Sequence, residues 1–306
     1  MNLFKVGIVI PTLNPGSSFE QLLESLELLP FKNLRKLIID SSSSDQTADI
    51  SVKKGWELEV IRRKDFNHGG TRQFAVDLLS DCQLLIFLTQ DVIITNPGVF
   101  NSLISPFSDP KVGAVCGRQL PHLDANPLAV HLRNFNYPKQ SIVRDFKDIE
   151  KNGLKTAFMS DSFAAYRREA LLEVGGFPKN IIFGEDMYVT AKMILSEWRV
   201  SYEANAYCLH SHNYTFLEEF KRYFDVGVFF NRELWLNDNF GGGGQEGLSY
   251  VKSEFIYLVS NNFFWIPRSI FSNLFKFIAY KLGKNERFLP VSLKKVMTAN
   301  KMFWKA

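Results

Sequence analysis

Residues 6–14 read VGIVIPTLN, five apolar or small residues followed directly by Pro11, Thr12, Leu13 and Asn14. A short run without polar side chains is typical of a strand that is covered on both faces of a sheet. Ligands of open parallel sheets bind beyond the carboxyl ends of the strands. We therefore expect residues 11–14 to line a binding site.

The same pattern recurs along the first half of the chain. Strands are predicted at 36–40, 57–62, 84–88 and 112–115, with amphipathic helices at 17–29, 45–54, 70–80 and 96–106. Apolar runs alternating with helical segments are typical of a mostly parallel sheet covered by helices. The sequence thus predicts the α/β class.

Polar residues follow three of these strands at the point where each strand ends. The strand 36–40 ends in Asp40 and leads into a run of four serines that begins at Ser41. The strand 84–88 is followed by Thr89, Gln90 and Asp91. Together with Asn14, these residues are expected to share one crevice, with the serines forming a loop over the ligand.

Composition and termini limit the class of protein. Of the 306 residues, 46% are hydrophobic, which allows a sizeable core. Cys82, Cys116 and Cys208 are too far apart in sequence for a zinc or CxxC pattern, so we expect buried, reduced thiols in a cytoplasmic protein. The start of the chain resembles no signal peptide, and no apolar run approaches the roughly 18 residues of a membrane span.

The last part of the chain differs in charge and composition. Residues 251–306 hold ten Lys and Arg against two Asp and Glu, together with twelve aromatic residues. Basic and aromatic residues on short helices indicate a peripheral membrane surface. Packing within the protein or in a dimer remains an alternative, whereas the clustering with Ile, Leu and Val disfavours nucleic-acid binding. The run Gly241–Gly244 is either a mobile lid or hinge or a plain linker.

Asp91 and a later pair of histidines are candidate metal ligands. A hard divalent cation prefers carboxylate oxygens, although an isolated Asp after a strand is often only a turn residue. His210 and His212 stand two apart on an extended segment and so point the same way. Either could complete a metal site with Asp91, and a buried core histidine is the alternative for each.

Two further motifs open helices. Gly69 and Gly70 stand between His68 and Arg72, where free amides and cationic side chains suit a phosphate or a base, unless the glycines only form a turn. Glu185 and Asp186 follow Gly184. In a pair of neighbouring acids, the pKa of one is raised, and that acid can act as a general base. Alternatively, the two acids are present only because the helix dipole stabilises negative charge at the start of a helix.

In this order, the motifs resemble the inverting family 2 glycosyltransferases of the GT-A fold. The strings Phe66-Asn-His-Gly-Gly-Thr-Arg72, Gly175-Gly-Phe-Pro178 and His210-Ser-His-Asn-Tyr214 are similar to those of bacterial rhamnosyltransferases that use dTDP-L-rhamnose. The resemblance covers roughly residues 5–215. Gln90 stands where many such enzymes have a second acid, and Gln73 where an Asn is common.

The resemblance implies a role for each matching residue. Donor-binding residues would be Pro11, Thr12, Asn14, Asp40, Ser41, His68, Gly69, Arg72 and Gln90, with Asp40 accepting the N3–H of the base. Asp91 would bind Mg²⁺ or Mn²⁺ with His210 or His212. Asp186 would deprotonate the acceptor hydroxyl beside Glu185. Asp161 and Trp198 are candidates for acceptor binding, and a local turn is the alternative for Asp161.

The expected protein is a metal-dependent rhamnosyltransferase that acts on a lipid-linked saccharide at the inner face of the bacterial plasma membrane. The monomer and a homo-oligomer both remain open. A UDP-hexose or UDP-N-acetylhexosamine donor is the main alternative, because uracil offers the same N3–H as thymine. A non-catalytic glycan- or nucleotide-binding protein is a remote one. The expected domains are 1–215, with a nucleotide-binding half at 1–115 and an acceptor half at 116–215, and a helical region at 216–306.

Overall fold

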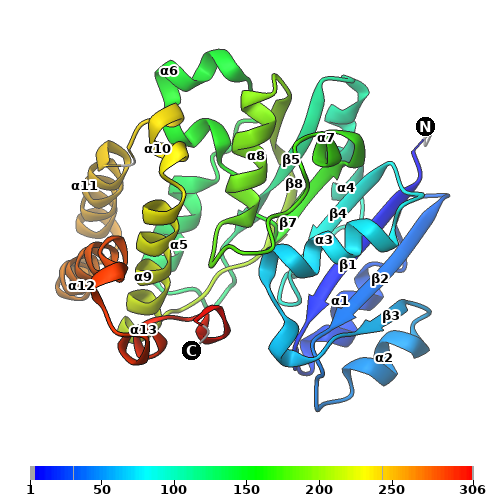
Figure 1. The fold of residues 1–306 in the computed structure, drawn as a ribbon, viewed down its shortest axis with the longest axis horizontal. Helices are drawn as coiled ribbons and strands as arrows, with labels where there is room; N and C mark the ends of the chain where they lie inside the picture. Colours follow the sequence, from blue (N-terminus) through cyan, green and yellow to red (C-terminus); the bar gives the residue numbers. More distant parts are fainter. Residues whose placement is uncertain (1–3, 30, 243, 305–306) are drawn as a thin grey trace.

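One eight-stranded mixed sheet forms the centre of the computed structural model, which describes residues 4–29, 31–242 and 244–304 (Figure 1). The strand order is β3-β2-β1-β4-β7-β5-β8-β6. The strands are β1 (Val6–Thr12), β2 (Leu34–Asp40), β3 (Glu57–Val60), β4 (Leu84–Leu88), β5 (Val112–Leu120), β6 (Ile142–Arg144), β7 (Phe163–Arg167) and β8 (Arg199–Leu209).

The first four strands in space are parallel, as the sequence predicts. β1 pairs with β2 and with β4, and Thr12 lies opposite Asp40 at the carboxyl end. The helices of this part are α1 (Ser18–Ser25), α2 (Thr47–Lys53), α3 (His68–Leu78), α4 (Val99–Ile104), α5 (Pro127–Asn136), α6 (Ile149–Asn152), α7 (Arg168–Glu173) and α8 (Glu185–Leu195). The α/β class is confirmed, and Cys82, Cys116 and Cys208 are free and buried.

β7 is a central strand that the sequence analysis did not predict. It runs antiparallel to both of its neighbours, β4 and β5, with Leu88 opposite Phe163. Two of its five residues are alanines, which have low strand propensity, so its pattern was weak. Because β7 runs in reverse, the loop that precedes it, with Asp161, lies at the carboxyl end of β4.

The C-terminal helices pack against the α/β part rather than apart from it. They are α9 (Phe216–Arg232), α10 (Leu234–Phe240), α11 (Gly244–Asn261), α12 (Ile266–Lys284) and α13 (Val291–Met297). Phe224 and Phe229 of α9 belong to the same buried cluster as Val189 of α8. The helical pattern begins where expected, but the shared core makes the region continuous with the preceding residues, so the predicted division into domains stays a prediction.

α9 and α12 cross at two glycines. A Cβ at Gly227 would lie 2.3 Å from the carbonyl oxygen of Tyr280, and one at Gly283 would lie 2.1 Å from that of Phe224. Any larger residue would push the helices apart, so α12 is held close against α9 over much of its length.

The glycine run connects α10 to α11. Gly241 has a φ of 76°, a conformation that glycine adopts without strain. Gly243 lies outside the described residues, and Gly244 begins α11. A lid or hinge role for this run stays a prediction. In the described ranges, no helix combines the length and apolar character that a bilayer crossing requires.

Candidate active site

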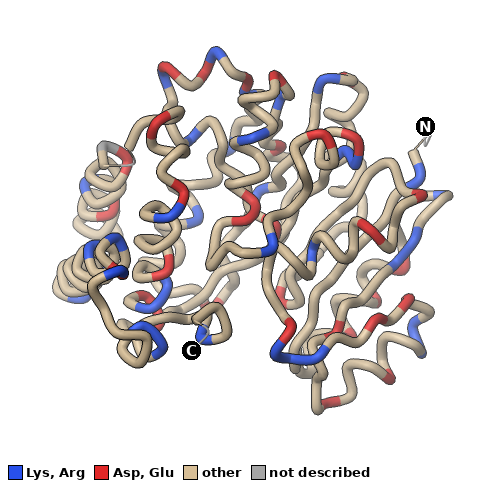
Figure 2. Tube along the Cα trace, viewed as in Figure 1, with Lys and Arg blue, Asp and Glu red and all other residues tan. Residues whose placement is uncertain are grey.

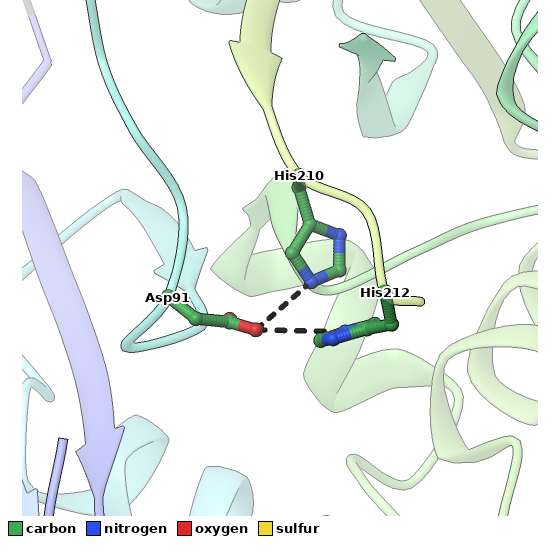
Figure 3. A group of neighbouring side chains, drawn as sticks. All are labelled: Asp91, His210 and His212. Carbon is green, nitrogen blue, oxygen red and sulfur yellow. Dashed lines mark ion pairs between the residues drawn. The ribbon is translucent and has the colours of Figure 1, made fainter. Parts of the chain in front are cut away.

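Asp91, His210 and His212 meet at one point of the crevice (Figure 3). The Oδ2 of Asp91 lies 3.4 Å from the Nε2 of His210 and 3.5 Å from the Nε2 of His212. β4 and β8 are not neighbours in the sheet. The chain after β4 crosses to β8, where Ile93 and Leu209 exchange two backbone hydrogen bonds of 2.9 Å, and this pairing brings the three side chains together.

Gln119 of β5 orients the His210 ring. The Nδ1 of His210 lies 2.9 Å from the Oε1 of Gln119, while the Nε2 of Gln119 donates to the hydroxyl of Ser160 at 2.8 Å. The amide oxygen can only accept, so Nδ1 carries the proton and Nε2 presents a lone pair towards Asp91. The sequence analysis did not identify Gln119, because nothing in its spacing distinguishes it from other strand residues.

The protonation states of this group suit a metal ion. Burial lowers the pKa of His210, and burial together with His210 lowers the pKa of His212 to about 4. Burial would raise the pKa of Asp91, but the neighbouring His210 holds the pKa well below the usual range. Neutral imidazoles beside an ionised carboxylate are the forms that bind metals. The donor set therefore fits a divalent cation.

A buried ion-pair network lies across the crevice from the metal ligands. The Nε of Arg72 lies 2.7 Å from the Oδ2 of Asp161, and its Nη1 lies 2.8 Å from the Oε1 of Glu185. The hydroxyl of Tyr166 donates to the Oδ1 of Asp161 at 2.6 Å. Arg72 and Asp161 both line a cavity that also reaches Asp91. Their contacts are first of all with each other, so the predicted donor and acceptor roles stay predictions.

Asp186 belongs to the same group of acids but forms no direct ion pair with the guanidinium of Arg72 among the described contacts. Its Oδ1 accepts from the amide of Met187 at 2.7 Å, and it lines the same cavity of about 480 Å³ as Asp91 and Arg72. Burial, Glu185 and Asp161 raise the pKa of Asp186 well above its ordinary value. Burial opposes the ionisation of Glu185, but Arg72 keeps the pKa of Glu185 low. A carboxylate with a raised pKa facing a cavity can act as a general base.

A second cavity of about 280 Å³ lies beyond β1, next to Asp91. Pro11, Thr12 and Ser41 line it. Ser41 is buried, and its hydroxyl has no hydrogen-bond partner within the described part of the chain. A hydroxyl left unpaired at a cavity wall is available to a ligand.

Asp40 and Asn14 shape the loops around this cavity. The Oδ1 of Asp40 accepts from the Thr12 hydroxyl at 2.9 Å, and its Oδ2 accepts from the amide of Ser43 at 2.8 Å. The Oδ1 of Asn14 accepts from the amide of Ser44 at 2.7 Å. Both side chains are thus engaged in the loops, and their predicted contacts with the nucleoside stay predictions.

The hydrogen bonds of Gln90 explain why an amide side chain, rather than an acid, occupies this position. Its Oε1 accepts from the Leu13 amide at 2.7 Å, and its Nε2 donates to the Leu13 carbonyl at 3.2 Å. The side chain joins the loop after β4 to the loop after β1. A carboxylate has no donor for the carbonyl of Leu13, so an acid here would lose half of this contact.

Of the residues at the start of α3, some pack against neighbouring backbone and others line the cavity. A Cβ at Gly69 would lie 1.9 Å from the carbonyl oxygen of Pro178, so Gly69 allows the close approach of two backbones. Gln73 accepts from the amide of Phe177 at 2.8 Å, which fixes the same contact. His68 faces the cavity beside Ser41, and burial lowers its pKa.

Trp198 is not brought to the crevice. It precedes β8, whereas His210 follows the other end of that strand, and its ring packs on the core. Arg133 of α5 and Arg222 of α9 do line the cavity, and the sequence analysis missed them both. The guanidinium of Arg222 lies 4.9 Å from the centre of the Tyr214 ring. The sequence around these two arginines contains no motif that would predict their place at the cavity.

Replacement of Gln119 should weaken metal binding without touching a ligand. We expect Gln119→Leu to lower the affinity for Mn²⁺ by about 10–100-fold, since the His210 ring loses its orientation. Asp91→Asn should abolish tight binding, while Gln140→Leu in an exposed loop should have no effect. Calorimetric titration of the three variants tests this, and unchanged affinity in Gln119→Leu would contradict the assignment of His210.

Comparison with known proteins agrees with this geometry. The model of the family "Glycosyl transferase family 2" matches residues 7–175. The O-antigen chain rhamnosyltransferase RfbN of Salmonella typhimurium is 48% identical over 98% of this chain and 96% of its own length. The O-antigen chain rhamnosyltransferase WbaN of Salmonella anatum is 43% identical over 97% of this chain and 95% of its own.

Solved structures share the fold at low sequence identity. A mannosyltransferase from Pyrobaculum calidifontis, in complex with GDP-Man and Mn²⁺, has a TM-score of 0.66 at 14% identity over 92% of this chain and 87% of that one. TarS of S. aureus with UDP-GlcNAc has a TM-score of 0.53 at 14% identity, over 93% and 91%. The predicted GT-A fold is confirmed, and the chain belongs to glycosyl transferase family 2 as a glycosyltransferase of that fold.

Proposed function

We propose that this glycosyltransferase moves L-rhamnose from dTDP-L-rhamnose to a hydroxyl of a lipid-linked saccharide during the synthesis of a cell-envelope polysaccharide. The observation that carries the proposal is the 48% identity to an O-antigen chain rhamnosyltransferase over nearly the full length of both chains. Identity of this extent includes β8 and the C-terminal helices, which a family-wide match over residues 7–175 does not.

In the proposed reaction, Asp186 takes the proton of the acceptor hydroxyl. The acceptor oxygen attacks the anomeric carbon on the face opposite the diphosphate, so the new C–O bond forms as the bond to the phosphate oxygen breaks. The sugar configuration inverts, and the bond electrons leave with the diphosphate. Arg222 and Arg133 line the cavity and supply positive charge for this leaving group.

The ligand chemistry favours Mn²⁺ over Mg²⁺ as the cofactor. Imidazole nitrogens suit first-row transition metals, whereas Mg²⁺ prefers oxygen ligands alone. Asp91, His210 and His212 would hold the ion, with open coordination positions towards the cavity. When bound, it would neutralise charge on the departing diphosphate.

Replacement of the proposed base should separate activity from stability. We expect Asp186→Asn to slow transfer by about 10²–10⁴-fold. Because the folded state raises the pKa of Asp186, its ionisation destabilises the fold as pH rises above the unfolded value of about 3.9. The variant should therefore melt at a higher temperature than the parent at pH 8, and the difference should shrink near pH 4.

Glu185→Gln is the matched control. The folded state lowers the pKa of Glu185, so its charge stabilises the fold at neutral pH, and this variant should melt at a lower temperature. Full transfer activity in Asp186→Asn would rule out its role as base. Thermal melting across pH and initial-rate assays give both readouts.

A donor panel tests the proposed substrate. In the presence of Mn²⁺, dTDP-L-rhamnose should raise the melting temperature more than dTDP-glucose, UDP-glucose or UDP-N-acetylglucosamine at equal concentration. Occupancy at 100 times the dissociation constant contributes about 2.7 kcal/mol. dTDP-glucose separates recognition of the base from recognition of the sugar. Stronger stabilisation and turnover with a UDP-sugar would overturn the rhamnose donor, and mass spectrometry of the product identifies the sugar transferred.

Peripheral attachment to an anionic membrane is part of the proposal. α12 and α13 carry basic residues but no acidic ones (Figure 2). Exposed apolar side chains on α11, on α12 and between these two helices include Phe255, Val259, Phe263, Phe264, Ile270 and Phe271. Exposed apolar patches rimmed by cations are typical of membrane-binding surfaces.

Removal of the whole tail is a poor test, because α12 packs on α9 and the Asn300 side chain donates to the carbonyl of Ile182 beside the crevice. We expect instead that Phe263→Ser with Phe264→Ser lowers binding to phosphatidylglycerol vesicles by at least about tenfold, since each Phe contributes about 1.5–3 kcal/mol when buried. Leu28→Ser with Val60→Ser, at exposed sites of the α/β part, is the control. Equal co-sedimentation of both double variants would favour a packing or dimer role.

A further inference from the structure

A second large cavity lies among the C-terminal helices. Its volume is about 580 Å³, within the roughly 300–1,000 Å³ of cavities that bind small organic molecules. It is enclosed by α5, α9, α11 and α12, which group on the left of Figure 1. Its walls are mainly apolar and include Leu132, Phe135, Val226, Phe230, Val251 and Phe277. None of the residues assigned to donor, metal or base lines it.

This cavity adjoins the catalytic one. The two share six lining residues, which are Leu132, Asn136, Tyr223, Val226, Phe230 and Lys276. The catalytic cavity contains Asp186 and Asp91. A molecule whose polar end reaches the base would therefore meet apolar surroundings next to these six side chains.

One cation stands at the junction of the two cavities. Lys276 of α12 is 8% exposed and lines both. Its Nζ lies 3.5 Å from the Oε1 of Glu219 and 5.6 Å from the ring centres of Tyr223 and Tyr250. A buried ammonium group at the border between a polar and an apolar cavity is placed to meet an anionic group attached to a hydrocarbon chain.

The far side of the cavity reaches the exposed apolar helix faces. Val251 of α11 and Phe277 of α12 line the cavity and are also exposed at the surface. Lys281 of α12 lines the same region. The apolar walls thus continue from the junction at Lys276 to the surface that we propose faces the membrane.

We infer that this cavity binds the hydrocarbon chain of the lipid-linked acceptor, with Lys276 facing an anionic group, such as a phosphate or diphosphate, between the chain and the saccharide. The inference rests on the proposed transfer to a lipid-linked acceptor and deepens it by assigning the site of the lipid. The polar saccharide then extends towards Asp186, and the hydrocarbon chain runs between α11 and α12 towards the bilayer.

Two matched tryptophan variants test the site directly. Val251 lines the cavity, whereas Val259 stands two turns further along α11 and does not, and both are about half exposed. We expect Val251→Trp to weaken the binding of farnesyl diphosphate by at least about tenfold, while Val259→Trp stays within about twofold of the parent. Gly247→Leu, where an added Cβ meets open space at the cavity wall, is a second filling variant.

Three probes separate the chemical contributions. Calorimetry without any nucleotide sugar measures the affinity for three probes. Farnesol reports on binding of the chain, inorganic diphosphate on binding of the anion, and farnesyl diphosphate on both together. Val251→Trp should weaken binding of farnesyl diphosphate and farnesol and leave that of inorganic diphosphate unchanged. Lys276→Met should weaken binding of farnesyl diphosphate but not that of farnesol.

Equal binding of farnesyl diphosphate by Val251→Trp, Gly247→Leu and Val259→Trp would overturn the site. So would equal affinity of the parent for farnesyl diphosphate and inorganic diphosphate. Thermal melting with the best donor confirms that each variant is folded. Because the probes contain no sugar nucleotide, a wrong donor assignment leaves this result intact, and the loss of chain binding leaves the donor assignment intact.

Discussion

The buried ion pairs of Arg72 join the two halves of the active crevice. Arg72 belongs to α3, whereas Asp161 precedes β7 and Glu185 begins α8. Removal of one partner from a buried ion pair costs about 3–5 kcal/mol, because the remaining charge stays without compensation. The close contact of Gly69 with Pro178 brings α3 near enough for this network to form. The Arg72 ion pairs therefore act together with the Gly69–Pro178 contact and the β4–β7 pairing to fix α3 against the residues before β7 and the start of α8.

This network also determines which acid can act as a base. Three carboxylates surround one cation, and Asp161 and Glu185 occupy its nitrogens. Asp186 is left facing the cavity, and its burial, together with two acidic neighbours, raises its pKa. Across the same cavity, His210 keeps Asp91 ionised. Two carboxylates with pKa values shifted in opposite directions can serve as base and metal ligand, and the divergence follows from their neighbours rather than from their own positions in sequence.

Local patterns predicted the parallel strands, the crevice and a metal site of Asp91 with either His210 or His212, whereas the structure groups all three. The patterns could not predict contacts that depend on tertiary pairing. The antiparallel β7 has a weak strand pattern, and only its direction explains how Asp161 reaches Arg72. Gln119 and Arg222 have no motif around them. The position of Trp198 was equally hard to predict, because the residues around it do not show at which edge of the sheet they lie.

The C-terminal helices connect the segment after β8, which carries His210 and His212, to the proposed lipid site. Thr215 caps α9 directly after the segment that carries His212, and the Tyr214 ring lies 5.0 Å from the His212 ring. From α12, the guanidinium of Arg268 donates to the carbonyl oxygen of Tyr214 at 2.9 Å. The helix that carries Lys276 thus also supports the segment of His212, a candidate metal ligand. Any displacement of α12 would act on that segment directly, so the proposed lipid site and the candidate metal site share one structural element.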